Sequence, residues 1–170
     1  MSTLTMNKII IIGSPGSGKS TFARALQRLT KLPLIHLDRL YWNPDRSIVD
    51  KSMFLANLQA VLAQKAWIID GNYVSTMELR LQACDTVFFL DYPTEVCLAG
   101  LEARRGQARP DLPWIELSDE QDTDFIEFVE NYRQEQRPQV LELLAQYKDK
   151  QVYVFESREQ AQQYLDREAL

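Results

Sequence analysis

An eight-residue segment near the start of the chain, residues 13–20, constrains the fold more than any other part of the sequence. It reads Gly-Ser-Pro-Gly-Ser-Gly-Lys-Ser: a glycine, four free positions, and then glycine, lysine and a hydroxyl residue. This spacing is typical of loops that hold nucleotide phosphates, and such a loop joins a buried strand to a helix. The neighbouring sequence has both, because residues 8–12 form a short run dominated by isoleucine and residues 21–29 have helical spacing.

Each part of this loop has an expected task in binding a nucleoside triphosphate and Mg²⁺. The glycines allow backbone conformations in which consecutive N–H groups point toward phosphate oxygens. Lys19 supplies a charge to the β and γ phosphates, and the Ser20 hydroxyl is placed to bind Mg²⁺. The positive end of the following helix faces the same point. The expected nucleotide-binding residues are Gly13, Ser14, Pro15, Gly16, Ser17, Gly18, Lys19, Ser20 and Thr21.

The length and charge of the chain limit the classes of protein to which it could belong. A chain of 170 residues is expected to form one domain, residues 1–170, and 19 basic against 24 acidic residues give a net charge of −5. This composition does not favour direct binding of DNA or of an anionic membrane, and no apolar run is long enough to span a bilayer. The first seven residues lack the pattern of a secretory signal peptide. Cys84 and Cys97 form no C-x-x-C pair, so we expect buried, reduced thiols in a cytoplasmic protein rather than a zinc site.

Short apolar runs alternate with helical patterns along the rest of the chain. This alternation predicts an α/β fold in which a parallel sheet is covered by helices on both faces. Asp38, Asp70 and Asp91 stand at the ends of the second, third and fourth expected strands. Because ligands bind at the carboxyl ends of parallel strands, we expect these carboxylates on the same rim as the loop. The five expected strands are residues 8–12, 34–37, 67–70, 86–90 and 151–155.

Four further segments give the chain a resemblance to a known family. They are His-Leu-Asp-Arg-Leu-Tyr-Trp at 36–42, Trp-Ile-Ile-Asp-Gly-Asn-Tyr at 67–73, Leu-Asp-Tyr-Pro-Thr-Glu at 90–95 and Arg-Pro-Asp at 109–111. With the loop, they make the chain similar to the adenylate-kinase-like branch of phosphate-loop kinases, and most similar to bacterial kinase-related proteins labelled DNA topology modulation proteins.

The resemblance implies a fold and an arrangement of regions. The fold would be the three-layer P-loop NTPase fold of nucleoside monophosphate kinases, with a five-stranded parallel sheet in the order 2-3-1-4-5. An acceptor-binding region would lie at about residues 38–65, and a short, mobile lid at about residues 104–120. The phosphoryl donor would be ATP, with Mg²⁺ as the metal.

The resemblance also implies catalytic residues. Lys19 and three arginines at or within the lid, Arg104, Arg105 and Arg109, would stabilise the transferring phosphoryl group. Asp38 would orient an acceptor hydroxyl or take its proton. A carboxylate that caps the next turn explains Asp38 equally well, so both interpretations stay open.

Two carboxylates are candidates for binding the metal. The resemblance implies that Asp70 holds Mg²⁺ through a water molecule beside Ser20, because these kinases carry their Asp-Gly pair there. Asp91 follows four apolar residues and also fits the pattern of a metal-binding carboxylate after a strand, but we interpret it as structural or as a second-shell acid.

The chain departs from adenylate kinases in ways that place AMP in doubt as the acceptor. Residues 72–74 read Asn-Tyr-Val where adenylate kinases have Phe-Pro-Arg, and Gly100 stands where they have an arginine. Arg80 could reach an acceptor phosphate, although a solvated helix charge is favoured.

Other residues have a functional and a structural interpretation side by side. Tyr41, Trp42 and Tyr73 could form an aromatic wall for a substrate or pack beneath the acceptor region. His36 lies in an apolar strand and is interpreted as a core residue with a satisfied side chain. Arg158 lies where such folds approach the nucleotide base, but its place in a capping box, residues 157–160, is sufficient explanation.

We therefore expect an enzyme that transfers the γ-phosphoryl group of MgATP to a small-molecule or nucleotide acceptor. One alternative is a nucleotide-dependent regulatory protein that affects DNA topology without kinase activity. A second is a GTP-driven switch, which the absence of an Asn-Lys-x-Asp motif after a strand argues against.

Overall fold

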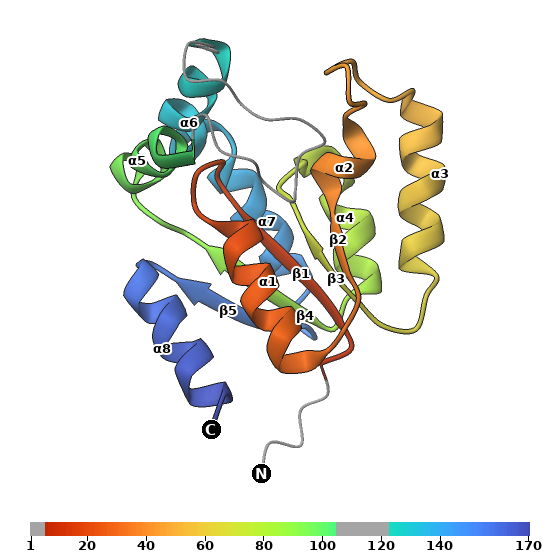
Figure 1. Ribbon diagram of the computed structural model, residues 1–170, viewed down its shortest axis with the longest axis vertical. Coiled ribbons are helices and arrows are strands. Elements are labelled where there is room, and N and C mark those ends of the chain that lie inside the picture. The colour runs from red at the N-terminus through yellow and green to blue at the C-terminus, as the bar shows by residue number, and fades with distance from the viewer. Residues whose placement is uncertain (1–5, 105–122) are drawn as a thin grey trace.

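The computed structural model describes residues 6–104 and 123–170 (Figure 1). Helices and strands alternate along most of the chain, as the sequence predicts. The elements are β1 (Lys8–Gly13), α1 (Lys19–Thr30), β2 (Leu34–His36), α2 (Leu37–Tyr41), α3 (Lys51–Leu62), β3 (Trp67–Asp70), α4 (Val74–Ala83), β4 (Thr86–Leu90), α5 (Thr94–Arg104), α6 (Thr123–Glu135), α7 (Arg137–Gln146), β5 (Gln151–Phe155) and α8 (Arg158–Glu168).

The five strands form one parallel sheet in the order β2-β3-β1-β4-β5, which confirms the predicted order. Strand β1 is central, and Ile10 pairs in register with Ile69 of β3 and with Val87 of β4. The four consecutive isoleucines of β1 are completely buried, as expected for a strand covered on both faces. The sheet therefore places the end of β1 at its centre, and the loop begins there.

Alternate residues of β1 face two separate helical layers. Ile9 and Ile11 belong to a core with side chains of α1, α5 and α8, whereas Ile10 and Ile12 belong to a core with side chains of α3, α4 and α7. Figure 1 shows α1 and α8 on the near side of the sheet and α4 and α7 on the far side. The protein is thus a three-layer α/β structure, as predicted.

Strand β2 ends at His36, one residue before its predicted end. The next residue, Leu37, begins the short helix α2 and is completely buried. Its side chain packs on Gly71, where an added Cβ atom would lie 2.7 Å from Leu37. Asp38 consequently lies in the first turn of α2 and not at the end of a strand.

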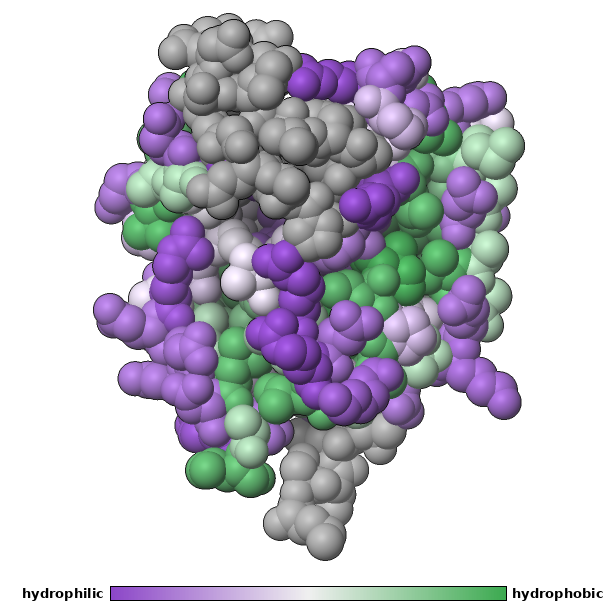
Figure 2. All heavy atoms as spheres, viewed as in Figure 1, coloured by the Kyte–Doolittle hydropathy of each residue, from purple (hydrophilic) through white to green (hydrophobic). Residues whose placement is uncertain are grey.

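Hydrophilic and hydrophobic residues both reach the surface in the coloured part of the face shown in Figure 2. Hydrophobic residues are visible on this face between α1 and α3, near the edge strand β2. No helix within the described residues is both long enough and apolar enough to cross a membrane.

Candidate functional site

The phosphate loop, residues 13–20, includes the turn between β1 and α1. Gly18 caps α1 with a φ of 94°, and no side chain makes a capping hydrogen bond to the first turn. Residues with a side chain rarely adopt this φ, which explains the glycine. The N–H groups of the first turn thus remain available to a ligand, and the positive end of the helix dipole favours an anion there.

Helix α5 packs with its backbone directly against this loop. A Cβ atom on Gly16 would lie 2.0 Å from the carbonyl oxygen of Cys97, and one on Gly100 would lie 2.0 Å from the carbonyl oxygen of Gly16. Both distances are far inside van der Waals contact, so each position requires glycine. The sequence presents Gly100 as a lost arginine, whereas the structure shows that it permits the close approach of α5 to the loop.

Lys19 is bonded within the loop, and the charges of several other predicted site residues act on it. Its Nζ atom donates a hydrogen bond of 3.0 Å to the carbonyl oxygen of Ser14. Burial lowers the pKa of the Lys19 ammonium, Asp38 and Asp70 oppose this effect, and Arg104 adds to it. Charges act on one another in this way only at short range. Asp38, Asp70 and Arg104 therefore lie within the range over which their charges act on Lys19.

Asp38 is held by a tyrosine from another part of the chain. The Tyr73 hydroxyl donates a hydrogen bond to Asp38 Oδ1, and the Trp42 side chain makes a further hydrogen bond to Tyr73. Burial and the charge of Asp38 raise the pKa of this phenol far above its usual range, so it remains a donor. Asp38 is not the N-cap of its helix, since that position belongs to His36.

The aromatic residues near Asp38 pack against one another. The ring centroid of Tyr41 lies 5.0 Å from that of Trp42, 4.7 Å from that of Tyr73 and 5.5 Å from that of Phe54. These distances are typical of aromatic pairs within a packed cluster. These rings therefore pack against one another, as the structural interpretation expects, while the acceptor region itself stays a prediction.

The turn that carries Tyr73 is fixed by a buried arginine. Arg80 of α4 is completely buried, and its guanidinium donates to the carbonyl oxygens of Gly71, Asn72 and Tyr73 at 2.9, 2.7 and 2.8 Å. Tyr73 itself has a φ of 23°, which is unusual for a residue with a side chain. Burial lowers the pKa of Arg80 to about 10, so the group stays charged at neutral pH. Both sequence interpretations of Arg80 are wrong, because the side chain is neither solvated nor directed at an acceptor phosphate.

Asp70 ends β3 beside the last residue of β2. The two residues are paired in the sheet register, and His36 Nδ1 lies 2.7 Å from Asp70 Oδ2. Both side chains are buried. His36 is thus a satisfied core residue, as predicted, but its partner is a carboxylate whose charge also acts on Lys19. Sequence pattern gave no sign of this pairing, since the two residues are 34 positions apart.

The donor set near the loop fits Mg²⁺. The Ser20 hydroxyl oxygen is buried and has no hydrogen-bond partner among the described residues, which is the condition expected of an oxygen that serves a ligand. Mg²⁺ takes one or two protein oxygens and completes its shell with water and substrate phosphates. No group of three or more potential ligands from His, Cys, Asp and Glu occurs in the described ranges.

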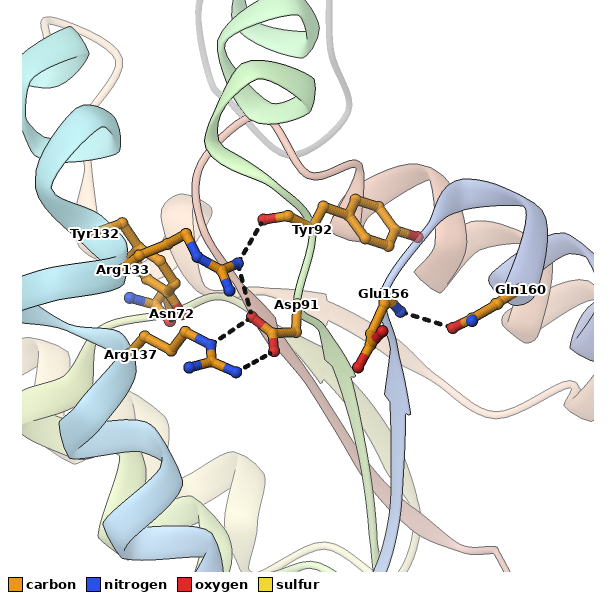
Figure 3. Close-up of polar contacts among 8 residues, drawn as sticks. All are labelled: Asn72, Asp91, Tyr92, Tyr132, Arg133, Arg137, Glu156 and Gln160. Carbon is orange, nitrogen blue, oxygen red and sulfur yellow. Dashed lines mark hydrogen bonds and ion pairs between the residues drawn. The ribbon is translucent and has the colours of Figure 1, made fainter.

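Asp91 is engaged in ion pairs with arginines of α6 and α7 (Figure 3). Arg137 donates to its two carboxylate oxygens, each over 2.8 Å, and Arg133 approaches it at 3.5 Å. Figure 3 shows both arginines reaching Asp91 from the side of α6 and α7. This geometry supports the structural interpretation of Asp91. A hollow of about 370 Å³ lies beside it, lined by Asp91, Pro93, Thr94, Glu95, Arg133, Arg137 and Glu156.

Some of the predicted residues are placed differently or cannot be placed. Thr21 is exposed, and its hydroxyl accepts a hydrogen bond of 3.4 Å from Arg24. Arg104 is the last residue of α5. Arg105 and Arg109, with the remainder of the expected lid at 104–120, lie outside the described residues.

The fold and the loop together define a class, the three-layer α/β proteins of nucleoside monophosphate kinase type. The sequence matches no protein-family model, and it matches none of the curated proteins. Solved structures do match it. It is similar to a shikimate kinase from Acinetobacter baumannii in complex with shikimate, with a TM-score of 0.62, 19% identity and coverage of 96% of this chain and 93% of that one.

Two further structures extend the comparison. A shikimate kinase from Bacteroides thetaiotaomicron gives a TM-score of 0.58 at 19% identity, with 96% of each chain covered. A gluconokinase from Sinorhizobium meliloti 1021 gives 0.57 at 15% identity, covering 96% of this chain and 89% of that chain. At such identities these similarities establish the fold, which is that of P-loop kinases. The resemblance to DNA topology modulation proteins stays a prediction.

Proposed function

We propose that this protein is a kinase that transfers the γ-phosphoryl group of MgATP to a hydroxyl group of a small molecule. The proposal is carried by the open first turn of α1 with Lys19 bonded inside the loop, and by Asp38, which the Tyr73 hydroxyl holds and whose charge acts on Lys19. A phosphate loop alone indicates binding of a nucleotide. A fixed carboxylate whose charge acts on the loop lysine adds a group that can act on an acceptor.

The site residues have different roles in the proposed phosphoryl transfer. The loop N–H groups and Lys19 bind the phosphates, and Lys19 with Arg104 stabilises the charge on the transferring oxygens. Ser20, and Asp70 through water, would hold Mg²⁺, which neutralises phosphate charge when bound. We propose that Arg105 and Arg109, in the expected lid, stabilise the charge on the transferring oxygens in the same way as Arg104.

Asp38 acts on the acceptor. The acceptor oxygen forms a bond to the γ-phosphorus while the bond from that phosphorus to the β–γ bridging oxygen breaks, and ADP leaves. The hydroxyl proton passes to Asp38, whose orientation is fixed by the Tyr73 hydroxyl. A carboxylate is sufficient here because phosphoryl transfer depends mainly on positioning and charge stabilisation.

The acceptor is proposed to be a small hydroxyl compound rather than AMP. The similar structures are named as shikimate kinase, gluconokinase and a sugar kinase. In this chain, Arg80 is bonded to backbone carbonyls and cannot serve as a phosphate-binding arginine. We also propose a cytoplasmic location, because both cysteines are buried free thiols.

A coupled ADP-release assay tests the proposal. MgATP is presented with nucleoside monophosphates, nucleosides, sugars and sugar acids, and the Lys19→Ala variant is the control. Acceptor-dependent ADP release that disappears in the variant is expected. If only slow release independent of every acceptor is found, the kinase proposal is overturned.

The resemblance to DNA topology modulation proteins supports a second candidate, a nucleotide-dependent regulator of DNA topology. It rests on the segments at 36–42 and 67–73, which carry that likeness. Gel-shift titrations with plasmid DNA at low salt, with and without MgATP, test it. Binding that weakens steeply as salt rises would support this candidate. A titration at low salt without any shift of the DNA would exclude direct DNA binding.

A further inference from the structure

We propose that Arg158 is a positioning residue for the phosphate loop, which tightens the binding of nucleotide phosphates by holding two loop carbonyl groups. This proposal rests on the loop binding nucleotide phosphates, as proposed above. It goes beyond that function by giving the last helix of the chain a part in the donor site. The sequence interpretation, in which the capping box accounts for Arg158, leaves this contact unexplained.

The contact joins residues that are about 140 positions apart. Arg158 Nη1 donates to the carbonyl oxygen of Ser17 over 2.9 Å, and Nη2 donates to the carbonyl oxygen of Gly16 over 3.1 Å. The two nitrogens thus hold consecutive carbonyls with the fork geometry that is specific to a guanidinium. A lysine could supply the charge but could not bridge both oxygens in this way.

The surroundings leave room for the guanidinium and orient it. A Cβ atom on Gly18 would lie 2.8 Å from Nη1, and one on Gly100 would lie 3.1 Å from Nη2, so the group lies between two glycines. It also lies over the ring of Tyr92, with 5.4 Å from the guanidinium carbon to the ring centroid. The phosphate loop, α5 and the residue after Asp91 therefore all meet this one side chain.

The start of α8 sets the direction from which Arg158 approaches. Ser157 is the N-cap and accepts a hydrogen bond of 3.2 Å from the backbone N–H of Gln160. Arg158 is the first residue of the helix, so its backbone is fixed by this cap. The cap and the loop contact are compatible, and the cap places the side chain that makes the contact.

The effect on the loop follows from the polarity of the peptide group. The carbonyl of Gly16 shares its peptide with the N–H of Ser17, and the carbonyl of Ser17 shares its peptide with the N–H of Gly18. A cation bonded to the carbonyl makes the N–H on the other side of the same peptide a stronger donor. The Ser17 N–H closes the loop through a 3.1 Å hydrogen bond to the Ser14 carbonyl, so this bond is strengthened.

The second peptide acts on the ligand. In the described part of the chain, no backbone group accepts a hydrogen bond from the Gly18 N–H. This N–H lies at the start of α1, where an anion is favoured, and it is available to a phosphate oxygen. Arg158 thus strengthens both the shape of the loop and one of its phosphate donors without touching the nucleotide.

Binding measurements on the full chain separate this role from others. We compare wild type, Arg158→Gln and Arg158→Lys for binding of MgATP, MgADP, adenosine and base-free tripolyphosphate by calorimetry. Arg167→Gln is the matched control, because it removes the same charge from an exposed position at the far end of α8. Thermal unfolding of all four proteins monitors the fold.

The expected result is a loss of affinity of about tenfold in Arg158→Gln for MgATP, MgADP and tripolyphosphate alike, with adenosine unaffected. Arg158→Lys should recover only part of the loss, and Arg167→Gln should bind as wild type does. Amide ¹H NMR shifts of Ser17 and Gly18 should move upfield in Arg158→Gln, since polarisation of both peptides is lost. A purely structural effect would lower the melting temperature without this selectivity.

If wild type binds nucleotide, three outcomes would overturn the proposal. Unchanged affinity for tripolyphosphate in Arg158→Gln would show that Arg158 does not support phosphate binding by the loop. A loss of affinity confined to ligands that carry adenine would show that Arg158 serves the base instead. Full recovery by Arg158→Lys would leave only a general charge effect. If wild type itself binds no nucleotide and no tripolyphosphate, the proposed function fails as well, so the two failures are distinguishable.

Discussion

The two sides of the candidate site are built in different ways. The phosphate loop is one continuous segment, residues 13–20, at the end of the central strand. The proposed acceptor side is assembled from Asp38 in α2, Tyr73 in the turn after β3 and Arg80 in α4. The loop can therefore be recognised from spacing alone, whereas the acceptor side exists only when three distant segments meet. Substitutions should separate the two sides.

The largest effect is expected from Lys19→Ala, which breaks the donor side alone. The substitution removes the charge that faces the transferring phosphoryl group, so kcat should fall by about 10² to 10³. Acceptor binding and thermal stability should change little. Steady-state kinetics with the acceptor identified in the ADP-release assay measure this, with Lys148→Ala at an exposed site as the control. If the free energy of unfolding fell as much as is expected below for Arg80→Ala, the two sides of the site would not be independent.

Arg80→Ala should break the acceptor side while leaving the loop intact. Three carbonyl oxygens of the turn at 71–73 would lose their donor, and a cavity would remain in its place. The free energy of unfolding should fall by about 3 kcal/mol. Urea denaturation checks this value, and calorimetry of MgATP binding below the transition checks the loop.

Arg80→Lys distinguishes charge from geometry at the same position. The lysine keeps a cation but cannot bond three carbonyls in the fork of a guanidinium. We expect most of the loss seen in Arg80→Ala to persist. Wild-type stability in Arg80→Lys would show that the buried charge, and not the three hydrogen bonds, holds the turn.

Tyr73→Phe is a milder test of the acceptor side. It removes the hydroxyl that holds Asp38 but preserves the aromatic packing with Tyr41. We expect kcat to fall by about tenfold, with the KM for ATP unchanged. An equal change in the KM for ATP would mean that this tyrosine also supports the donor side.

The same variant should alter the dependence of stability on pH. The pKa of Tyr73 is raised in the folded protein, so its contribution is fully present below about pH 10 and is lost as the pH rises above that value. Stability of the wild type should therefore decline above pH 10 more steeply than that of Tyr73→Phe. Urea midpoints measured between pH 8 and 11 would show parallel declines if the phenol were in fact exposed.

The smallest effect is expected from Asp91→Asn, which tests whether Asp70 or Asp91 serves the metal. Loss of the ion pair with the partly exposed Arg137 should lower the free energy of unfolding by about 1 kcal/mol. The Mg²⁺ concentration needed for half-maximal activity should not change. Asp70→Asn should raise that concentration, and a reversed pattern between the two variants would transfer the metal role to Asp91.

Much of the fold was accessible from sequence because it depends on local pattern. The bounds of β3, β4 and β5 agree with the predicted ranges, since each is a short run of apolar and β-branched residues between polar turns. The end of β2 was missed by one residue because Leu37 turns inward to pack on Gly71, a contact between distant segments. The strand order came from family resemblance and is confirmed by the structure.

Arg80 shows why part of the site could not be predicted. It lies at helical spacing from Met77 and next to Leu81, on the buried face of α4, so its position did carry a signal. A charged residue on such a face is ordinarily assigned to solvent, because burial of a charge is costly. Only the carbonyl oxygens of residues 71–73, which the fold brings to that point, make the burial favourable.

The sequence by itself determined the phosphate loop, because the conformations that glycine permits and the order of strand, loop and helix are local properties of the chain. The tertiary structure decided which side chains surround that loop. Asp38 is oriented by Tyr73, Asp70 is paired with His36, and Arg158 reaches the loop from the last helix. These contacts join residues from 34 to 142 positions apart, so sequence periodicity carries no record of them.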